Sequence, residues 1–352
     1  MQQFIGCDAH KKFSVFVAVN ENGQAGEAIR VEHDRSLYRQ FLARLPAKSP
    51  IAIEASGHYS WLVDEMERLG HCPKLAHPLE AKLRMGKTKK TDKLDAKGLA
   101  ILLRNGTLPE VWIPPGELRD QRELLRLRMF FVVLRTRVKT RIHGTLGRHN
   151  IQVSVSDLFG AEGRAQLAQR SGELPLHSRE AVTQELAVLD FLEEEIESTE
   201  KRLGAIMAVS PDADFLKTLP CVGKILSMVL MLEIGRVERF PTSAHLASYA
   251  GLVPRVFASG GHTRMGQVCG NVNRNLKWAF VEAANLVVIH QRRLAGSHVV
   301  RLYQRLKKTK NHQKAVVAVA RHLAEAAYWV LKNQEVYRDP QLMRQALSST
   351  HG

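Results

Sequence analysis

Hydrophobic and polar positions predict an α/β region at the start of the chain. Residues 3–8 and 12–19 are rich in β-forming residues and are separated by a short polar segment, which predicts a hairpin. Residues 36–45 have helical spacing, 50–54 have the pattern of a short buried strand, and 58–69 return to helical spacing. Strands and helices therefore alternate, as in an α/β layer.

Two more elements are expected before the composition changes. Residues 72–77 predict a further strand, and the basic segment GKTKKTD leads into a helix over 92–104 that ends at an Asn-Gly pair. A Pro-rich joint follows at 112–116. We therefore expect a first domain over residues 1–112.

A basic and an acidic helix are predicted after this joint. Residues 117–148 carry apolar positions at helical spacing among many arginines, whereas 179–206 repeat the period with acidic flanks. Opposite charges favour antiparallel pairing, so residues 113–208 are expected to form a helical coiled-coil arm. Such an arm is a common dimerisation device, and a solvated helix pair within one domain is an equally good interpretation.

The remaining pattern predicts a mostly helical domain over residues 209–345. A Pro-x-x-Gly turn ending at Gly223 separates two helical stretches. This is typical of a helix-hairpin-helix motif whose amides contact phosphate, and also of ordinary packed helices. A loop rich in Gly, Arg and Ser is expected around Ser259, followed by apolar helices at 274–291 and 313–332.

Composition and charge narrow the class of protein. The 352-residue chain is 45% hydrophobic and has neither an apolar run of the roughly 20 residues that cross a bilayer nor a signal-peptide pattern, so we expect a cytoplasmic protein. Its four cysteines form no CxxC pair, which argues against a zinc site or a disulfide framework. The net charge of +16 predicts a nucleic-acid partner. A merely basic protein or an anionic-membrane binder is the alternative.

Four carboxylates are the candidate chemistry. Asp8 and Glu54 end predicted strands, and Asp92 and Asp95 share one helix face. Such acids can converge on two cations against a phosphodiester, and their hard oxygen donors favour Mg²⁺ or Mn²⁺ over zinc. The structural alternative is that Asp92 caps the helix and Asp95 lies in its first turn, where the helix dipole favours negative charge.

This order of acids is typical of a ribonuclease H-like fold, and with it the chain resembles the IS110-type transposases, a family that includes the Piv invertases. The matching segments are IGCDAHKK, IAIEASGHY, KTDKLDAKGLA, LPCVGKILSMVLMLEIGRVERF and HLASYAGLVPRVFASGGHTR. The resemblance implies a RuvC-like DEDD domain holding metal on Asp8, Glu54, Asp92 and Asp95. It also implies a helical arm and a C-terminal transposase domain with a catalytic serine, here Ser259.

Two features near Ser259 qualify that resemblance. Taken alone, a Ser-Gly pair predicts an ordinary turn residue. The family usually continues with a Lys-x-Gly-Asn-Arg-like stretch, whereas this chain reads Gly-Asn-Val-Asn-Arg from Gly270 to Arg274. The Lys and the Gly that the family has at the first and third of these positions are therefore missing. The departure leaves the acids and Ser259 in place.

The resemblance further implies an RNA-guided DNA transposase or recombinase of an insertion sequence, associated with a bacterial nucleoid. Ser259 would form a phosphoserine link with the cut strand and release a 3′-OH that later reverses the step. A structured bridge RNA would select donor and target DNA, and a homo-oligomer, a dimer of dimers, would join them. The alternatives are a RuvC-like structure-specific nuclease that uses water and a nonenzymatic nucleic-acid scaffold.

Residues expected to contact nucleic acid follow the basic segments and the two turns described above. Phosphate contacts of this kind position a nucleic acid without reading its sequence. The predicted set is Lys87, Lys89, Lys90, Arg126, Arg135, Lys139, Gly223, Lys224, Arg255, Arg264, Lys307, Lys308 and Lys310.

Overall fold

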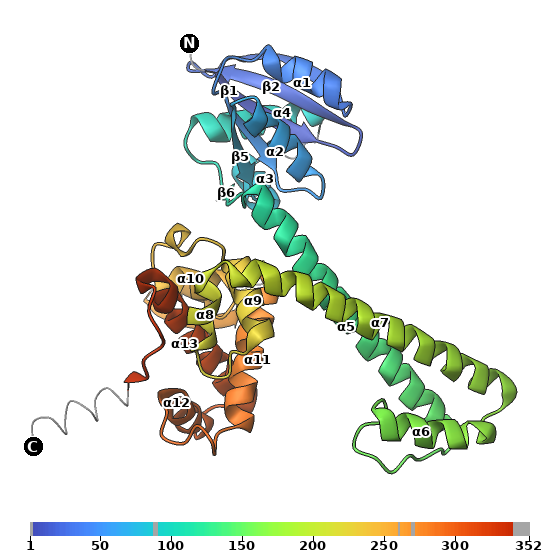
Figure 1. The fold of residues 1–352 in the computed structure, drawn as a ribbon. Coiled ribbons are helices and arrows are strands. Elements are labelled where there is room, and N and C mark those ends of the chain that lie inside the picture. The colour runs from blue at the N-terminus through green and yellow to red at the C-terminus, as the bar shows by residue number, and fades with distance from the viewer. Residues whose placement is uncertain (1–2, 87–90, 260, 269–271, 341–352) are drawn as a thin grey trace, which may run out of the picture. The chain divides into compact units, whose positions relative to one another are not determined.

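The computed structural model describes residues 3–86, 91–259, 261–268 and 272–340 (Figure 1). The chain divides into two compact units, Met1–Gly116 and Glu117–Gly352. The first is mixed α/β and the second is mostly helical, which confirms the predicted fold class at this level. The finer division at 1–112, 113–208 and 209–345 stays a prediction.

A six-stranded sheet forms the centre of the first unit, in the order β3-β2-β1-β4-β5-β6. Strand β1 pairs antiparallel with β2 and parallel with β4, and β4 pairs parallel with β5. Parallel neighbours need crossover connections, which α1 and α2 supply. The elements are β1 (Gln3–Ala9), β2 (Phe13–Asn20), β3 (Ala25–Glu32), α1 (Arg35–Ala43), β4 (Pro50–Glu54), α2 (Tyr59–Arg68), β5 (Cys72–Ala76), α3 (Pro78–Met85), α4 (Asp92–Arg104) and β6 (Glu110–Val111).

Helices cover both faces of this sheet. On one face, Tyr38 of α1 and Met66 of α2 pack with large apolar residues of the strands, such as Ile51. The other face carries smaller residues against α3 and α4, including Ala52 of β4. Fully buried side chains on both faces supply most of the hydrophobic stabilisation.

The contact between β1 and α4 is unusually close because Gly6 has no side chain. A Cβ atom at Gly6 would lie 1.9 Å from the Ala96 carbonyl oxygen and 2.7 Å from the Ala100 amide nitrogen. Real Cβ atoms essentially never approach other atoms so closely. Glycine at this position therefore lets the helix backbone rest directly on the strand.

Sequence periodicity predicted most of the first unit but missed three elements. The hairpin, the helices around 36–45, 58–69 and 92–104, and the strands at 50–54 and 72–77 are confirmed to within a few residues. Strand β3 was missed because it is an exposed edge strand in which only Val31 is buried. Helix α3 buries only Ala81, and β6 has two residues, so neither has a clear hydrophobic period.

The predicted antiparallel arm is present in the second unit. Helices α5 (Gly116–Arg148) and α7 (Leu176–Ala208) have 33 residues each, and ion pairs join the basic face of one to the acidic face of the other. Partner numbers on α7 fall as those on α5 rise, so the helices run in opposite directions. The pairs are Arg128 with Glu200 at 2.7 Å, Lys139 with Glu193 at 3.3 Å, and Arg141 with Glu185.

Separate hydrophobic clusters hold the two ends of the arm. At the far end, Ile142 of α5 packs with Val182 of α7 and with Leu167 of α6 (Ala161–Arg170). At the near end, Leu125 and Leu203 join the core of the helical body. The elements of that body and its short connecting helices are η1 (Ser171–Glu173), α8 (Pro211–Lys217), α9 (Lys224–Ile234), η2 (Val237–Arg239), α10 (Ser243–Tyr249), α11 (Arg274–Ile289), α12 (His298–Lys307) and α13 (His312–Asn333).

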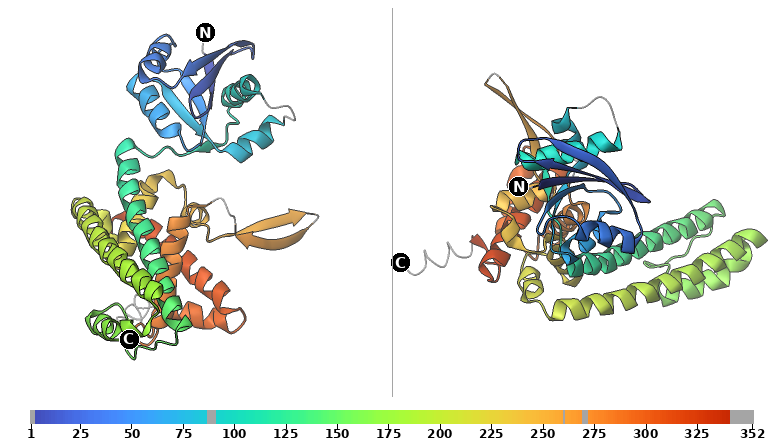
Figure 2. Two further views of the ribbon diagram at one scale, coloured as in Figure 1. Left: turned by 90° about the vertical axis from the view of Figure 1, so that its right-hand side faces the viewer. Right: turned by 90° about the horizontal axis from the view of Figure 1, so that it is seen from above.

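The prediction of a loop around Ser259 is wrong, because this segment forms a two-stranded hairpin. Strands β7 (Pro254–Ser259) and β8 (His262–Val268) pair antiparallel. The hairpin projects from the helices of its unit (Figure 2). Five of the six residues of β7 are exposed and none is buried, so this strand lacks the half-buried hydrophobic pattern that identifies a strand.

No helix within the described ranges combines the length and apolar character that crossing a membrane requires.

Replacing Gly6 with alanine is expected to loosen the first unit. The added Cβ forces β1 and α4 apart, and such overpacking costs about 1 to 3 kcal/mol. Amide hydrogen exchange in peptides from both elements should therefore accelerate about 5- to 150-fold.

Gly26→Ala is the matched control, since the nearest atom to its new Cβ, the Ala18 carbonyl oxygen, lies 3.7 Å away. Its exchange should stay close to wild type. Equal acceleration in both variants would contradict the close-contact explanation.

Candidate functional site

Strand β1 and helix α4 bring Asp8 and Asp92 together. Asp8 lies near the carboxyl end of β1, and Asp92 begins α4. The N-cap of α4 is Thr91, whose hydroxyl accepts the Leu94 amide at 3.3 Å. The suggestion that Asp92 caps the helix is therefore wrong, although both acids of its first turn still face the positive end of the helix dipole.

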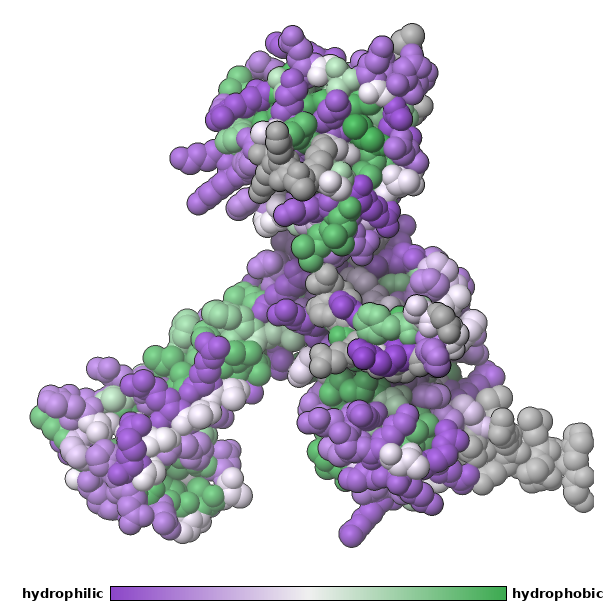
Figure 3. All heavy atoms as spheres, turned by 180° about the vertical axis from the view of Figure 1, so that it is seen from behind, coloured by the Kyte–Doolittle hydropathy of each residue, from purple (hydrophilic) through white to green (hydrophobic). Residues whose placement is uncertain are grey.

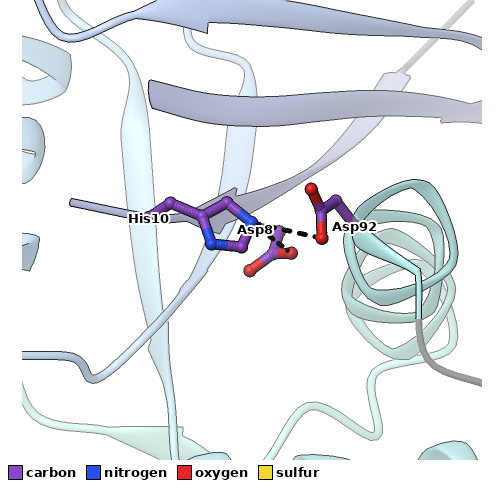
Figure 4. A group of neighbouring side chains, drawn as sticks. All are labelled: Asp8, His10 and Asp92. Carbon is purple, nitrogen blue, oxygen red and sulfur yellow. Dashed lines mark ion pairs between the residues drawn. The ribbon is translucent and has the colours of Figure 1, made fainter. Parts of the chain in front are cut away.

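The ring of His10 points towards both carboxylates (Figure 4). Its Nε2 atom is 3.3 Å from an oxygen of Asp8 and 3.3 Å from an oxygen of Asp92. Sequence reasoning missed His10 as a site residue. The available signal was its spacing, because residues two apart in an extended chain point to the same side.

Glu54 and Asp95 are placed by backbone register and helix spacing. Cys7 pairs with Ile53 in the parallel ladder, so Asp8 and Glu54 follow at the adjacent carboxyl ends of β1 and β4, on the sheet face that α4 covers. Asp95 is partly buried in the first turn of α4.

The donor atoms of Asp8, His10 and Asp92 lie within 4.8 Å of one another. Among the residues that the structure describes, this close group does not extend to Glu54 or Asp95. Two carboxylates and an imidazole are chemically suited to a divalent cation.

Ser259 lies on a polar face of the β7–β8 hairpin. It pairs across the hairpin with His262, and Phe257 pairs with Arg264, so these four residues share one face. A Cβ at Gly266 would lie 3.5 Å from the Cβ of Arg255, which puts that arginine on the same side. Ser259, His262 and both arginines are exposed. The face thus offers a hydroxyl beside cationic groups.

A buried carboxylate anchors the helix that follows this hairpin. Glu233 of α9 is fully buried and accepts hydrogen bonds from Asn273 at 2.8 Å and Asn275 at 2.7 Å. Arg122 and Arg126 of α5 approach its oxygens to 3.7 and 3.4 Å. Asn273 also caps α11, so the network ties the start of α11 to α9 and α5.

Burial alone would raise the pKa of Glu233. The hydrogen bonds from Asn273 and Asn275, together with the charges of Arg126 and Arg122, outweigh burial and hold this pKa below its ordinary value. Glu233 is therefore a charged, fully coordinated group inside the helical body.

Several predicted nucleic-acid contacts already have intramolecular partners. Arg126 approaches Glu233, and Lys139 pairs with Glu193 and lies 4.8 Å from the Phe159 ring centre. Arg135 is partly buried on α5. The exposed members are Arg126, Gly223, Lys224, Arg255, Arg264, Lys307, Lys308 and Lys310. Lys87, Lys89 and Lys90 lie outside the described residues, as do Gly270 and Asn271.

Comparison with known protein families agrees with this arrangement. The model of the IS110-type DEDD transposase domain matches residues 5–151, and the model described as the transposase IS116/IS110/IS902 family matches residues 213–299. The first contains all four predicted acids and His10. The second contains the β7–β8 hairpin together with Glu233, Asn273 and Asn275.

Individual relatives are also transposases or gene-inverting proteins. The transposase for insertion sequence element IS1328 of Yersinia enterocolitica is 25% identical over 87% of this chain and 90% of its own length. The transposase for IS1111A of Coxiella burnetii is 23% identical over 96% of this chain and 91% of its own. A pilin gene-inverting protein of Moraxella bovis is 29% identical over 36% of this chain and 38% of its own length.

An α/β unit with clustered acids, joined in one chain to a helical transposase domain, defines a DNA recombination enzyme whose DEDD-type domain indicates divalent-metal use. The chain belongs to the IS110 family of insertion-sequence transposases.

Removing the Glu233 carboxylate is expected to destabilise the second unit. Glu233→Ala removes the carboxylate that lies against the buried Arg122, and breaking a buried pair in this way costs about 3 to 5 kcal/mol. Urea unfolding monitored by circular dichroism measures the loss. Glu194→Ala, an exposed acid on α7, should change stability by less than about 0.5 kcal/mol.

The same carboxylate predicts a pH dependence. Because its folded-state pKa is lowered, its contribution is present above the unfolded value of 4.5 and is lost as pH falls through the folded-state pKa. Wild type should therefore lose stability below pH 4.5 more steeply than Glu233→Gln. Parallel stability curves for the two proteins would contradict this assignment.

Proposed function

We propose that the chain is an RNA-guided transposase that cuts and rejoins DNA through a phosphoserine at Ser259, with a divalent-metal centre on Asp8, Glu54, Asp92 and Asp95. The observation that carries the proposal is the convergence of Asp8 and Asp92 from a strand end and a helix start that are far apart in the sequence. Similarity to insertion-sequence transposases supports the reaction class.

The sheet topology supports a ribonuclease H-like first domain. Three antiparallel strands, β1 to β3, continue into parallel β4 and β5, with the candidate acids at the carboxyl ends of β1 and β4. This is the order expected of RuvC-like DEDD domains. Carboxyl ends of neighbouring parallel strands lie at one edge, so acids there can act together on a phosphate.

Ser259 is the proposed nucleophile. Its oxygen forms a bond to phosphorus while the bond from phosphorus to the 3′ oxygen breaks; the serine proton is lost and the 3′ oxygen gains one. Bound divalent cations in a centre of this kind stabilise the charge that develops on the phosphodiester. Arg255 and Arg264 share the Ser259 face and are the proposed phosphate contacts. Reversal on a second strand needs no external energy source, because the ester is retained.

Charge supports a DNA substrate together with a structured RNA guide. The chain carries a net charge of +16, and exposed basic residues lie at the start of α9, on the hairpin and after α12. Base pairing by an RNA would supply sequence choice, while the protein binds backbone and shape. The second-unit helices α8 and α9 are the proposed helix-hairpin-helix, with Gly223 and Lys224 at its turn.

The arm is the proposed surface for self-association, which would build the dimer of dimers. Hydrophobic side chains gather along the arm (Figure 3). On α5 the exposed members are Leu127, Phe130 and Val133, and on α7 they are Val188 and Phe191. A second copy of the same arm would cover such an apolar stripe in a self-complementary way.

A covalent protein–DNA species is the expected signature of the serine mechanism. Purified chain, labelled donor and target DNA, the RNA transcribed from the flanking element and Mg²⁺ or Mn²⁺ are combined and resolved on a denaturing gel. Wild type and the exposed-serine control Ser198→Ala should form the adduct, and Ser259→Ala and Asp8→Ala should not. Omission of the RNA should abolish it.

Two other results would redirect the proposal. Cleavage without an adduct that survives Ser259→Ala identifies a hydrolytic nuclease that uses water. DNA binding without any strand cleavage, unchanged in Asp8→Ala, identifies a nonenzymatic scaffold.

Polar substitutions on the arm stripe are expected to weaken self-association. Burying one phenylalanine side chain contributes about 1.5 to 3 kcal/mol, so Phe130→Ser and Phe191→Ser should each raise the dissociation constant about tenfold or more. Sedimentation velocity across a concentration series measures this. Leu83→Ser, at a residue of α3 that is 80% exposed, is the control. Monomeric wild type at every concentration would rule out the arm interface.

A further inference from the structure

His10 is the unassigned group closest to the acidic centre. We propose that His10 is a direct ligand of the divalent cation, through Nε2, and that it shifts the preference of the centre from Mg²⁺ towards Mn²⁺. The proposal rests on the proposed function, because it takes Asp8 and Asp92 as ligands of the same ion.

The position of Nε2 supports direct ligation. Within the described part of the chain this atom is buried without a hydrogen-bond partner, although an oxygen of Asp8 and an oxygen of Asp92 each lie 3.3 Å away. A buried nitrogen aimed between two carboxylates without hydrogen-bonding geometry is costly unless something else satisfies it. A cation held between the three groups satisfies all of them.

The spacing of the donor atoms fits three ligands of a single cation. Two ligands at right angles, each about 2.1 to 2.3 Å from a cation, are about 3.0 to 3.3 Å apart. The separations of 3.3 Å from Nε2 to each carboxylate oxygen agree with neighbouring positions around one ion. All three donor atoms lie within 4.8 Å of one another, which also permits opposite positions.

The imidazole is held in place by its own turn. The His10 amide donates to the Phe13 carbonyl oxygen at 2.9 Å, and the two rings lie 4.6 Å apart. Arg30 covers the Phe13 ring at 3.6 Å. Preorganised ligands lose little conformational freedom on binding a metal, as expected for a residue built into a site.

Donor chemistry predicts the selectivity. Mg²⁺ prefers oxygen ligands and gives up water reluctantly, whereas first-row transition ions accept imidazole nitrogen readily. A site with one nitrogen and two carboxylates therefore favours an ion such as Mn²⁺. The acids alone would bind both ions and discriminate less between them.

Electron paramagnetic resonance of Mn²⁺ bound to the full chain tests the proposal. Spin-echo modulation detects a ¹⁴N nucleus bonded directly to the ion, and titration of the free-ion signal gives the affinity. Wild type should show the nitrogen signal. His10→Ala and His10→Gln should lose it and bind Mn²⁺ at least about tenfold more weakly, with a smaller change for competing Mg²⁺. Circular dichroism confirms that both variants are folded.

Two controls separate the outcomes. His58→Ala, at an exposed histidine of the same unit, should keep the nitrogen signal, and Asp8→Asn should lose binding of both ions. Binding that depends on Asp8 but has no nitrogen signal, or a signal retained in His10→Ala, overturns the role of His10 and leaves the proposed metal centre standing. Absence of any Asp8-dependent binding of either ion overturns both.

Discussion

The rest of the first unit depends on the direct backbone contact between β1 and α4. Because Gly6 has no Cβ, the backbone of Ala96 lies directly against the strand, and Ala96 and Ala100 also pack against valines of β2. The position of the helix then fixes the first turn of α4, which places Asp92 close to Asp8. The geometry of this acidic group is thus set by packing, since protein interiors deform little. The acids come together because they lie at the ends of a strand and a helix whose relative position the packing fixes.

Sequence reasoning succeeded where hydrophobic periodicity is strong and failed where burial is one-sided or absent. Strands β1, β2 and β4 carry buried apolar runs, and they were predicted. Edge strand β3 and the Ser259 hairpin have few buried side chains, so their backbone pairing leaves almost no trace in the pattern. The four acids were selected by resemblance and by their positions at element ends. His10 was missed although its spacing of two residues from Asp8 offered a signal, because it lies beyond the end of β1, where hydrophobic periodicity gives no information.

Charge on this chain serves two purposes that composition cannot separate. Three basic residues of α5, Arg128, Lys139 and Arg141, pair with acids of α7. Arg122 approaches Glu233 inside the helical body. The nucleic-acid surface is therefore smaller than the count of lysines and arginines suggests. The exposed cations at the hairpin and around α12 are the residues proposed to contact phosphate. Because these ion pairs use both charges within the protein, any binding of nucleic acid to the arm should depend less on salt concentration.

The length of the arm has a mechanical consequence. A helix of 33 residues is about 50 Å long, and both arm helices meet the body at the same end. A rotation of about 10° at that end, a small change for packed helices, carries the tip through about 9 Å. The hydrophobic cluster at the tip keeps the two helices together during such a swing. Slight repacking around Leu125 and Leu203 would therefore be transmitted as a large displacement far from the helical body.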